Sequence, residues 1–194
     1  MLLMKKLILL SAMAIFFGMA GSAQSFEKGN HAINLGFGLG NTRYFGAYYK
    51  GFTPSVSASY EMGIVEVPMG TQLTGVVGVG GYLGWSTSRY EYNWSNYYYR
   101  YNNFMIAVRG NYHFIFHEKL DPYFGIWAGV NVFTGGWRGD PPYPSSSVYK
   151  PSRTGATGGA YVGARYYFTD NLAVYAELGY LISVLNLGIT FKIQ

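Results

Sequence analysis

The stretch Ser55-Val56-Ser57-Ala58-Ser59-Tyr60-Glu61-Met62 decides the fold, because its side chains alternate strictly in character. Every second residue from Val56 to Met62 is apolar or aromatic, and the positions between them hold serines and Glu61. Successive side chains of a β-strand point to opposite faces. The pattern therefore predicts a strand with one apolar and one polar face.

The same alternation recurs in seven further runs. They are His31–Gly40, Leu73–Trp85, Phe104–Phe114, Tyr123–Phe133, Gly159–Phe168, Leu172–Tyr180 and Val184–Ile193. Most are about 9–11 residues long, the length that a tilted strand needs to cross the hydrocarbon layer of a membrane. For the runs Leu73–Trp85 and Tyr123–Phe133, the third and fifth along the chain, the pattern leaves open which side chains point outwards. We favour Leu83, Trp85, Phe124 and Ile126 on the outer face.

The connections between the runs alternate between long and short. Residues 41–53, 86–103 and 134–158 form long connections, whereas 63–70, 115–121 and 169–171 form shorter ones. Outer-membrane barrels have short periplasmic turns and long outside loops. The chain is therefore predicted to be all-β, an eight-stranded antiparallel up-and-down transmembrane β-barrel, although the outside connection at 181–183 is unusually short.

The first 23 residues predict a cleavable signal peptide. Lys5 and Lys6 precede the apolar run Leu7–Ala20, and the small residues Gly21-Ser22-Ala23 follow it. A helix of fourteen apolar residues spans only about 21 Å, too short for a hydrocarbon core of roughly 30 Å. This order of segments predicts export with cleavage after Ala23, which leaves residues 24–194 as a single barrel domain.

The composition supports a sheet that faces lipid. The chain holds 20 Tyr, 13 Phe and 27 Gly, but only 12% charged residues and no cysteine. This aromatic content argues against a disordered chain. The net charge is +5 and falls to +3 without Lys5 and Lys6, and the basic residues form no cluster that would suggest binding to nucleic acid. Without disulfides, stability must come from another source, such as a closed sheet in which every backbone group is paired.

Charged side chains within the runs fall on the polar face. An arginine or lysine facing lipid near the middle of the membrane would cost about 2–4 kcal/mol, so these residues are predicted to face the barrel interior. We expect a lumen charge network of Glu61, Arg109, His113, Arg165, Glu177 and Lys192, with an ion pair between Arg165 and Glu177 across adjacent strands. Two interpretations remain, a structural plug and a proton or ion path; the narrow interior of an eight-stranded barrel favours the plug.

The outside connections are aromatic and basic. Possible contact residues are Arg89, Tyr92, Trp94, Tyr98, Arg100, Arg138, Lys150 and Arg153. Arginines make charge-assisted contacts with phosphates, so we hypothesise that this rim meets outer-leaflet lipopolysaccharide. The alternatives are scattered solubilising charge and, for the rings of residues 86–103, an aromatic girdle or an extension of the strands.

No pattern in the sequence indicates catalysis. The three histidines, His31, His113 and His117, lie far from the loop serines Ser145–Ser147, so no serine has a base within reach. Neither a phosphate-binding glycine loop nor a metal-spaced cluster of histidine and cysteine is evident. We therefore expect no enzyme, no cofactor and no metal.

The chain resembles the small outer-membrane β-barrel proteins of the OmpX, OmpW and OmpA transmembrane-domain type. The resemblance rests on the pattern of runs, on Tyr112-His113-Phe114 followed by Leu120-Asp121-Pro122-Tyr123-Phe124-Gly125, and on the closing segment Leu185–Lys192. It implies location in the bacterial outer membrane and insertion by the barrel-assembly machinery, for which Phe191 is the nearest candidate signal. It implies no single activity, because fold alone does not give function.

The function predicted from these observations is a structural or surface-interaction role with a plugged lumen and an extracellular partner of unknown nature. One alternative is a narrow uptake barrel for small or hydrophobic solutes, as the resemblance suggests. A lipid-modifying enzyme and a soluble lipocalin-like barrel are further alternatives. The soluble barrel would place its apolar residues inside, opposite to the arrangement predicted here.

Overall fold

The computed structural model describes residues 25–41, 49–50, 54–69, 73–91, 98–115, 117–138 and 152–194. Nine β-strands form in these ranges: β1 (His31–Asn41), β2 (Tyr49–Lys50), β3 (Ser55–Met69), β4 (Leu73–Glu91), β5 (Tyr98–Phe114), β6 (Leu120–Arg138), β7 (Ser152–Tyr167), β8 (Leu172–Gly179) and β9 (Ser183–Ile193). Eight of them are long, and the two-residue β2 pairs with β4. The predicted signal peptide, residues 1–23, lies outside the described residues.

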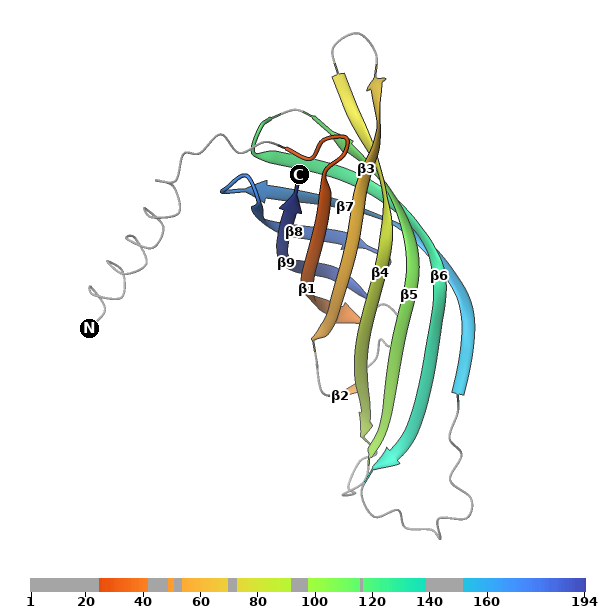
Figure 1. Cartoon of the computed structure of the whole chain (residues 1–194). Helices are drawn as coiled ribbons and strands as arrows, with labels where there is room; N and C mark the ends of the chain where they lie inside the picture. Colours follow the sequence, from red (N-terminus) through yellow and green to blue (C-terminus); the bar gives the residue numbers. More distant parts are fainter. Residues whose placement is uncertain are drawn as a thin grey trace, which may run out of the picture.

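The eight long strands close into a barrel. Each long strand pairs in antiparallel fashion with the next one along the chain, and β1 also pairs with β9, which completes the ring (Figure 1). His31 lies opposite Met62 of β3 on one side and Ile193 of β9 on the other. The predicted eight-stranded antiparallel barrel is confirmed.

Exposure alternates along the strands as the sequence pattern predicts. On β5, Val108 is 69% exposed and its neighbour Ala107 only 5%; on β6, Ile126 is 64% exposed and Trp127 only 5%. Trp85 of β4 is also exposed. The outer faces favoured for the two ambiguous runs, Leu73–Trp85 and Tyr123–Phe133, are therefore confirmed. The apolar faces therefore form the outer wall and the polar faces line the lumen.

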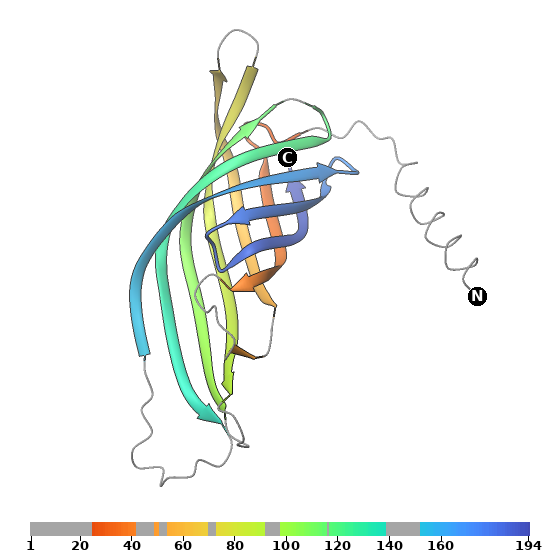
Figure 2. The ribbon, with the colours of Figure 1, turned by 180° about the vertical axis from the view of Figure 1, so that it is seen from behind.

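The wall is uneven in height. Strands β4, β5, β6 and β7 have 16 to 19 residues, whereas β8, β9 and β1 have 8 to 11. From behind, the long strands extend well beyond the short ones at the end of the barrel where residues 92–97 and 139–151 connect them (Figure 2). We call this the long-loop end, and the opposite end, with the turn at 168–171, the short-turn end.

Two expected connections are largely strand. Residues 63–70 were expected to form a turn, but β3 continues to Met69 and pairs with β4 after a shift of register between Gly63 and Val65. In the expected outside loop 86–103, residues 86–91 of β4 pair with residues 98–103 of β5. The strand-extension alternative therefore holds for these residues, because polar side chains on both faces suit a ribbon that rises into water.

The character of the described lumen changes along the barrel. Near the short-turn end the interior is charged. Towards the long-loop end it holds one buried apolar cluster of Tyr82, Met105, Ala107, Tyr123, Trp127, Tyr161, Leu181 and Ile182. The buried polar side chains Ser86, Asn103 and Asn131 lie beside this cluster and beyond it. Within the described ranges, no helix is long and apolar enough to cross a membrane.

Candidate functional site

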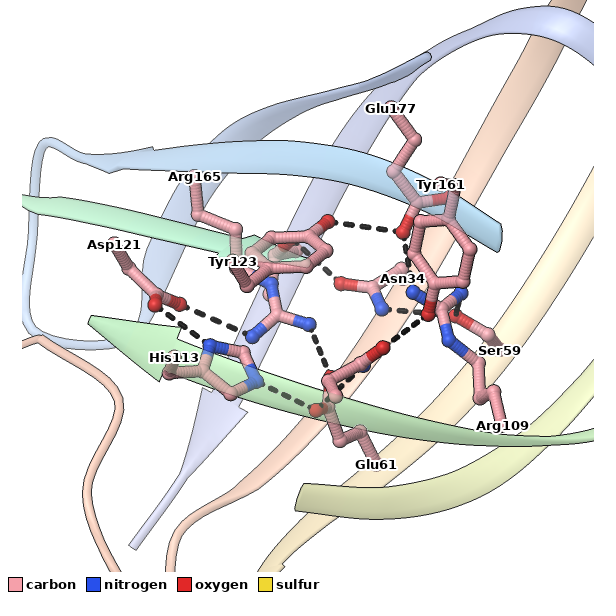
Figure 3. Close-up of polar contacts among 12 residues, drawn as sticks. Asn34, Ser59, Glu61, Arg109, His113, Asp121, Tyr123, Tyr161, Arg165 and Glu177 are labelled. Atoms are coloured by element: carbon pink, nitrogen blue, oxygen red, sulfur yellow. Dashed lines mark hydrogen bonds and ion pairs between the residues drawn. The ribbon is translucent and has the colours of Figure 1, made fainter. Parts of the chain in front are cut away.

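The candidate site in the lumen is a cluster of charges from five strands. Six side chains, none more than 3% exposed, form what we call the ion cluster: Glu61, Arg109, His113, Asp121, Arg165 and Glu177 (Figure 3). Five of them were predicted from the alternation of the strands. Three cations facing three anions would leave the cluster electrically neutral if His113 is protonated.

Glu61 of β3 is the most connected member. Its Oε1 accepts hydrogen bonds from His113 Nε2 and from Asn111 Nδ2, both at 2.6 Å, and its Oε2 accepts one from Arg165 Nη2 at 2.5 Å. His113 and Asn111 belong to β5, which only β4 separates from β3, whereas Arg165 belongs to β7, four strands away around the ring and on the far side of the lumen. The carboxylate therefore ties opposite walls of the barrel together.

His113 lies between two carboxylates. Its Nδ1 is 2.6 Å from Asp121 Oδ1, and its Nε2 is 2.6 Å from Glu61 Oε1. An ionised carboxylate only accepts hydrogen bonds, so with Glu61 and Asp121 both ionised each ring nitrogen donates and the ring is an imidazolium cation. Arg165 Nη1 donates to the second oxygen of Asp121 at 3.2 Å, which links all four side chains.

A second group surrounds Arg109. Its Nη2 donates to Glu177 Oε1, and its Nη1 donates to Ser59 Oγ at 3.3 Å. The Tyr123 hydroxyl donates to the same oxygen of Glu177 at 2.9 Å (Figure 3). The guanidinium also lies over the Tyr161 ring, 4.5 Å from its centroid, a favourable position for a cation.

The N-terminal segment packs into the short-turn end of the lumen. Phe26 is fully buried, with its ring 4.5 Å from the His113 ring and 5.3 Å from the Arg165 guanidinium. Lys192, the sixth predicted lumen charge, is buried here rather than in the ion cluster: its Nζ donates to the Ser25 carbonyl at 3.3 Å and lies 4.8 Å from the centre of the Tyr167 ring.

Two predictions about these charges were wrong. Arg165 does not pair with Glu177; it pairs with Glu61 and Asp121, while Glu177 pairs with Arg109. The prediction considered only adjacent strands, whereas lumen side chains also reach across the interior. Asp121 was expected in a turn, but it is the second residue of β6 and 1% exposed. Continuing the inward phase of Tyr123 back by two residues would have found it.

Towards the long-loop end, the connection between β8 and β9 folds into the lumen. Leu181 and Ile182 are 3% and 1% exposed and belong to the apolar cluster with Trp127. The indole Nε1 of Trp127 donates to the Tyr180 carbonyl at 2.7 Å, which holds this connection in place. Sequence reasoning noted that the connection is short but not that it turns inwards.

Three of the predicted rim residues come together on the outer face of the β4–β5 ribbon. Arg89 lies directly opposite Arg100, and the Tyr98 ring lies 5.0 Å from the Arg89 guanidinium and 5.7 Å from that of Arg100. Arg100 Nη2 also donates to the Tyr98 hydroxyl at 3.1 Å. Arg138 ends β6 opposite Tyr98, and Arg153 is exposed on β7. Tyr92, Trp94 and Lys150 lie outside the described residues.

Comparison with known families decides what kind of barrel this is. The model of the outer membrane protein beta-barrel domain matches residues 9–189, nearly the whole chain. The chain belongs to this family. Its location is therefore the bacterial outer membrane, as predicted.

Solved structures of the same architecture resemble this outer-membrane barrel at low sequence identity. The attachment invasion locus protein Ail of Yersinia pestis, in complex with the heparin analogue sucrose octasulfate, matches with a TM-score of 0.51 and 13% identity, over 86% of this chain and 99% of Ail. A second Ail structure gives a TM-score of 0.48 at 15% identity, with the same coverage. The N-terminal barrel domain of Pseudomonas aeruginosa OprF gives 0.44 at 17% identity, over 86% of this chain and 98% of that domain.

No curated protein matches the sequence. Neither the family description nor the names of these structures refers to an enzymatic activity. In the part of the barrel that the structure describes, no group of three histidine or acidic side chains is arranged to hold a metal ion.

Proposed function

We propose that this outer-membrane barrel is a closed, non-conducting protein with a structural and surface-interaction role. The observation that carries the proposal is the ion cluster, whose members come from opposite walls and bond to one another across the lumen. An eight-stranded barrel has an interior just wide enough for side chains to fill. A permeating ion would therefore have to separate buried ion pairs.

Two further contacts support closure at both ends of the cluster. Phe26 packs on His113 and Arg165 at the short-turn end, which the usual topology of such barrels places in the periplasm. Ile182 and Trp127 pack in the apolar layer towards the outside. A solute would meet an apolar layer, then a layer of paired charges, then an aromatic ring.

The interior also supports a role without catalysis. A general base needs an unprotonated nitrogen or oxygen within reach of a substrate. Both nitrogens of His113 are engaged by carboxylates, and its side chain is fully buried. His31 Nδ1 lies 2.5 Å from the Tyr60 hydroxyl on the outer wall, away from the lumen. Neither histidine is placed to act on a molecule bound at the outer rim.

The partners that fit this proposal lie at the surface and in the membrane. The paired arginines of the β4–β5 ribbon carry positive charge above the lipid-facing wall, which suits the phosphates of outer-leaflet lipopolysaccharide. Phe191, 43% exposed on the last strand, remains the candidate signal for the barrel-assembly machinery. We propose no nucleic-acid partner.

Planar-bilayer recording tests the closed lumen. Purified full-length protein inserted into a bilayer is expected to give no single-channel steps, while a general diffusion porin in the same bilayer serves as the positive control. A variant that shortens three lumen rings, Y82A/W127A/Y161A, is the matched opening control. Steady, reproducible steps from the unaltered protein would overturn the proposal and favour a narrow uptake barrel.

A further inference from the structure

The outer face formed by β3, β4 and β5 carries two features that the closed barrel does not need. One is the pair Arg89 and Arg100, which lie opposite each other in the register of the two strands. The other is a shallow groove of about 260 Å³, which lies on the same wall but nearer the short-turn end. Its lining residues are Val56, Ser57, Ala58, Leu83, Gly84, Trp85 and Phe104.

The arginine pair is arranged for an anion. Like charges directly opposite on neighbouring strands destabilise a sheet. Instead of turning apart, both guanidinium groups lie against the Tyr98 ring, and Arg100 is held by a hydrogen bond to the Tyr98 hydroxyl. Among the described side chains, no carboxylate pairs with either arginine. An anion bound between them would remove the repulsion.

The groove is arranged for an apolar chain. Ala58 lies opposite Leu83, and the small Gly81 lies opposite Tyr60, so small outward positions sit between larger ones. Trp85 and Phe104, 41% and 40% exposed, form the wall of the groove nearest the arginines. Aromatic residues mark the boundary between hydrocarbon and headgroups, so the groove lies just inside the hydrocarbon layer.

The distance between the two features fits a lipid. Trp85 and Phe104 are opposite each other, and Arg89 and Arg100 form the row four residues further along the same face. Four residues of strand span about 14 Å, or about 10 Å along the membrane normal at the usual tilt. This places the arginines at the level of the headgroups, directly above the groove.

We infer that the β4–β5 face binds a phosphorylated glycolipid of the outer leaflet, with a phosphate between Arg89 and Arg100 and an acyl chain in the groove. The inference rests on the proposed surface-interaction role and adds to it a single site that binds the phosphate and an acyl chain of the same lipid. The occupant is a lipid and not a soluble anion, because the cations sit beside an apolar groove at the membrane boundary.

The test measures lipid retention by the full chain in phosphatidylcholine vesicles that contain a minor fraction of bisphosphorylated lipid A. Protein is extracted in mild detergent, and bound lipid A is counted by mass spectrometry. Each arginine contributes charge-assisted contacts, so R89Q/R100Q is expected to weaken retention by about tenfold or more. Filling the groove with A58F should weaken it without changing charge, and K28Q, which removes an exposed lysine at the opposite, short-turn end, should leave it unchanged.

Two competitors separate the possible sources of the anion. Dephosphorylated lipid A is expected to bind weakly and equally to the unaltered protein and to R89Q/R100Q. If R89Q/R100Q retains bisphosphorylated lipid A as well as the unaltered protein does, the inference is wrong. If inorganic phosphate displaces all the lipid A and A58F has no effect, the arginines bind soluble anions and the lipid assignment is overturned.

The same preparations keep the two proposals distinguishable. If the unaltered protein retains no lipid A but stays silent in bilayer recordings, the lipid site is wrong and the closed barrel stands. If it conducts, the closed barrel is wrong, whatever lipid it retains.

Discussion

Replacing Glu61 with glutamine should weaken the barrel more than any other single isosteric change in the ion cluster. The side chain keeps its shape but loses its charge, so three cations would face only Asp121 and Glu177. The new amide would also present donor hydrogens to donors, because Glu61 now accepts three hydrogen bonds. Removing one partner from a buried ion pair costs about 3–5 kcal/mol.

That loss is large against the typical stability of a folded protein, about 5–15 kcal/mol. The free energy of unfolding can be measured by denaturant titration of the protein in detergent micelles, followed by tryptophan fluorescence and by heat-dependent gel mobility. Glu66 offers a matched control, because it lies on the same strand and is exposed. E66Q should change the free energy by less than about 0.5 kcal/mol.

A double variant separates the charge from the shape of the site. If Glu61 acts by compensating Arg165, then E61L/R165M should lose less stability than the two single changes added together, since no arginine is left without its partner. An E61Q protein as stable as E66Q would refute the reasoning, because the buried carboxylate would then carry no charge that the cluster needs.

Three further changes test other parts of the structure. A methyl group at Gly163 would lie 2.6 Å from a lumen tyrosine ring, whereas one at Gly155 on the same strand would meet open space. G163A should therefore lower the free energy of unfolding by about 1–3 kcal/mol, and G155A should leave it nearly unchanged. F26A should cost about 3 kcal/mol and speed hydrogen exchange at the short-turn end, because the ring is fully buried there; unchanged exchange would contradict its role in closure. In vesicles, V108R should lower the free energy of unfolding by about 2–4 kcal/mol, while T154R, on an exposed part of β7, should lower it little. Equal losses of stability would argue against a lipid-facing Val108.

The sequence alone predicts the membrane-spanning part of the barrel well. Lipid imposes a strict alternation, because a charge such as Arg109 or Arg165 is costly on the outer wall and must face inwards. Beyond the membrane this constraint is lost. The ribbon of residues 86–91 and 98–103 carries polar side chains on both faces, so nothing in its pattern separates strand from loop.

Contacts across the lumen could not be predicted in the same way. Strand order gives the neighbours of Arg165 along the wall, but its partner Glu61 is 104 residues away on a strand that is not adjacent. Phe26 was missed for a different reason. It precedes the first alternating run, so no periodicity marks it, and only the closed barrel shows the opening that it fills.

Five of the eight long strands contribute a member to the ion cluster. Because the side-chain period of a strand is two, a slip of one residue in any of these pairings would turn the strand over and move its charge into hydrocarbon. The partner left behind would be unpaired as well, so each slipped arrangement is penalised twice. During insertion, the interior charges would thus select the correct alignment of strands from many that backbone hydrogen bonding alone would tolerate.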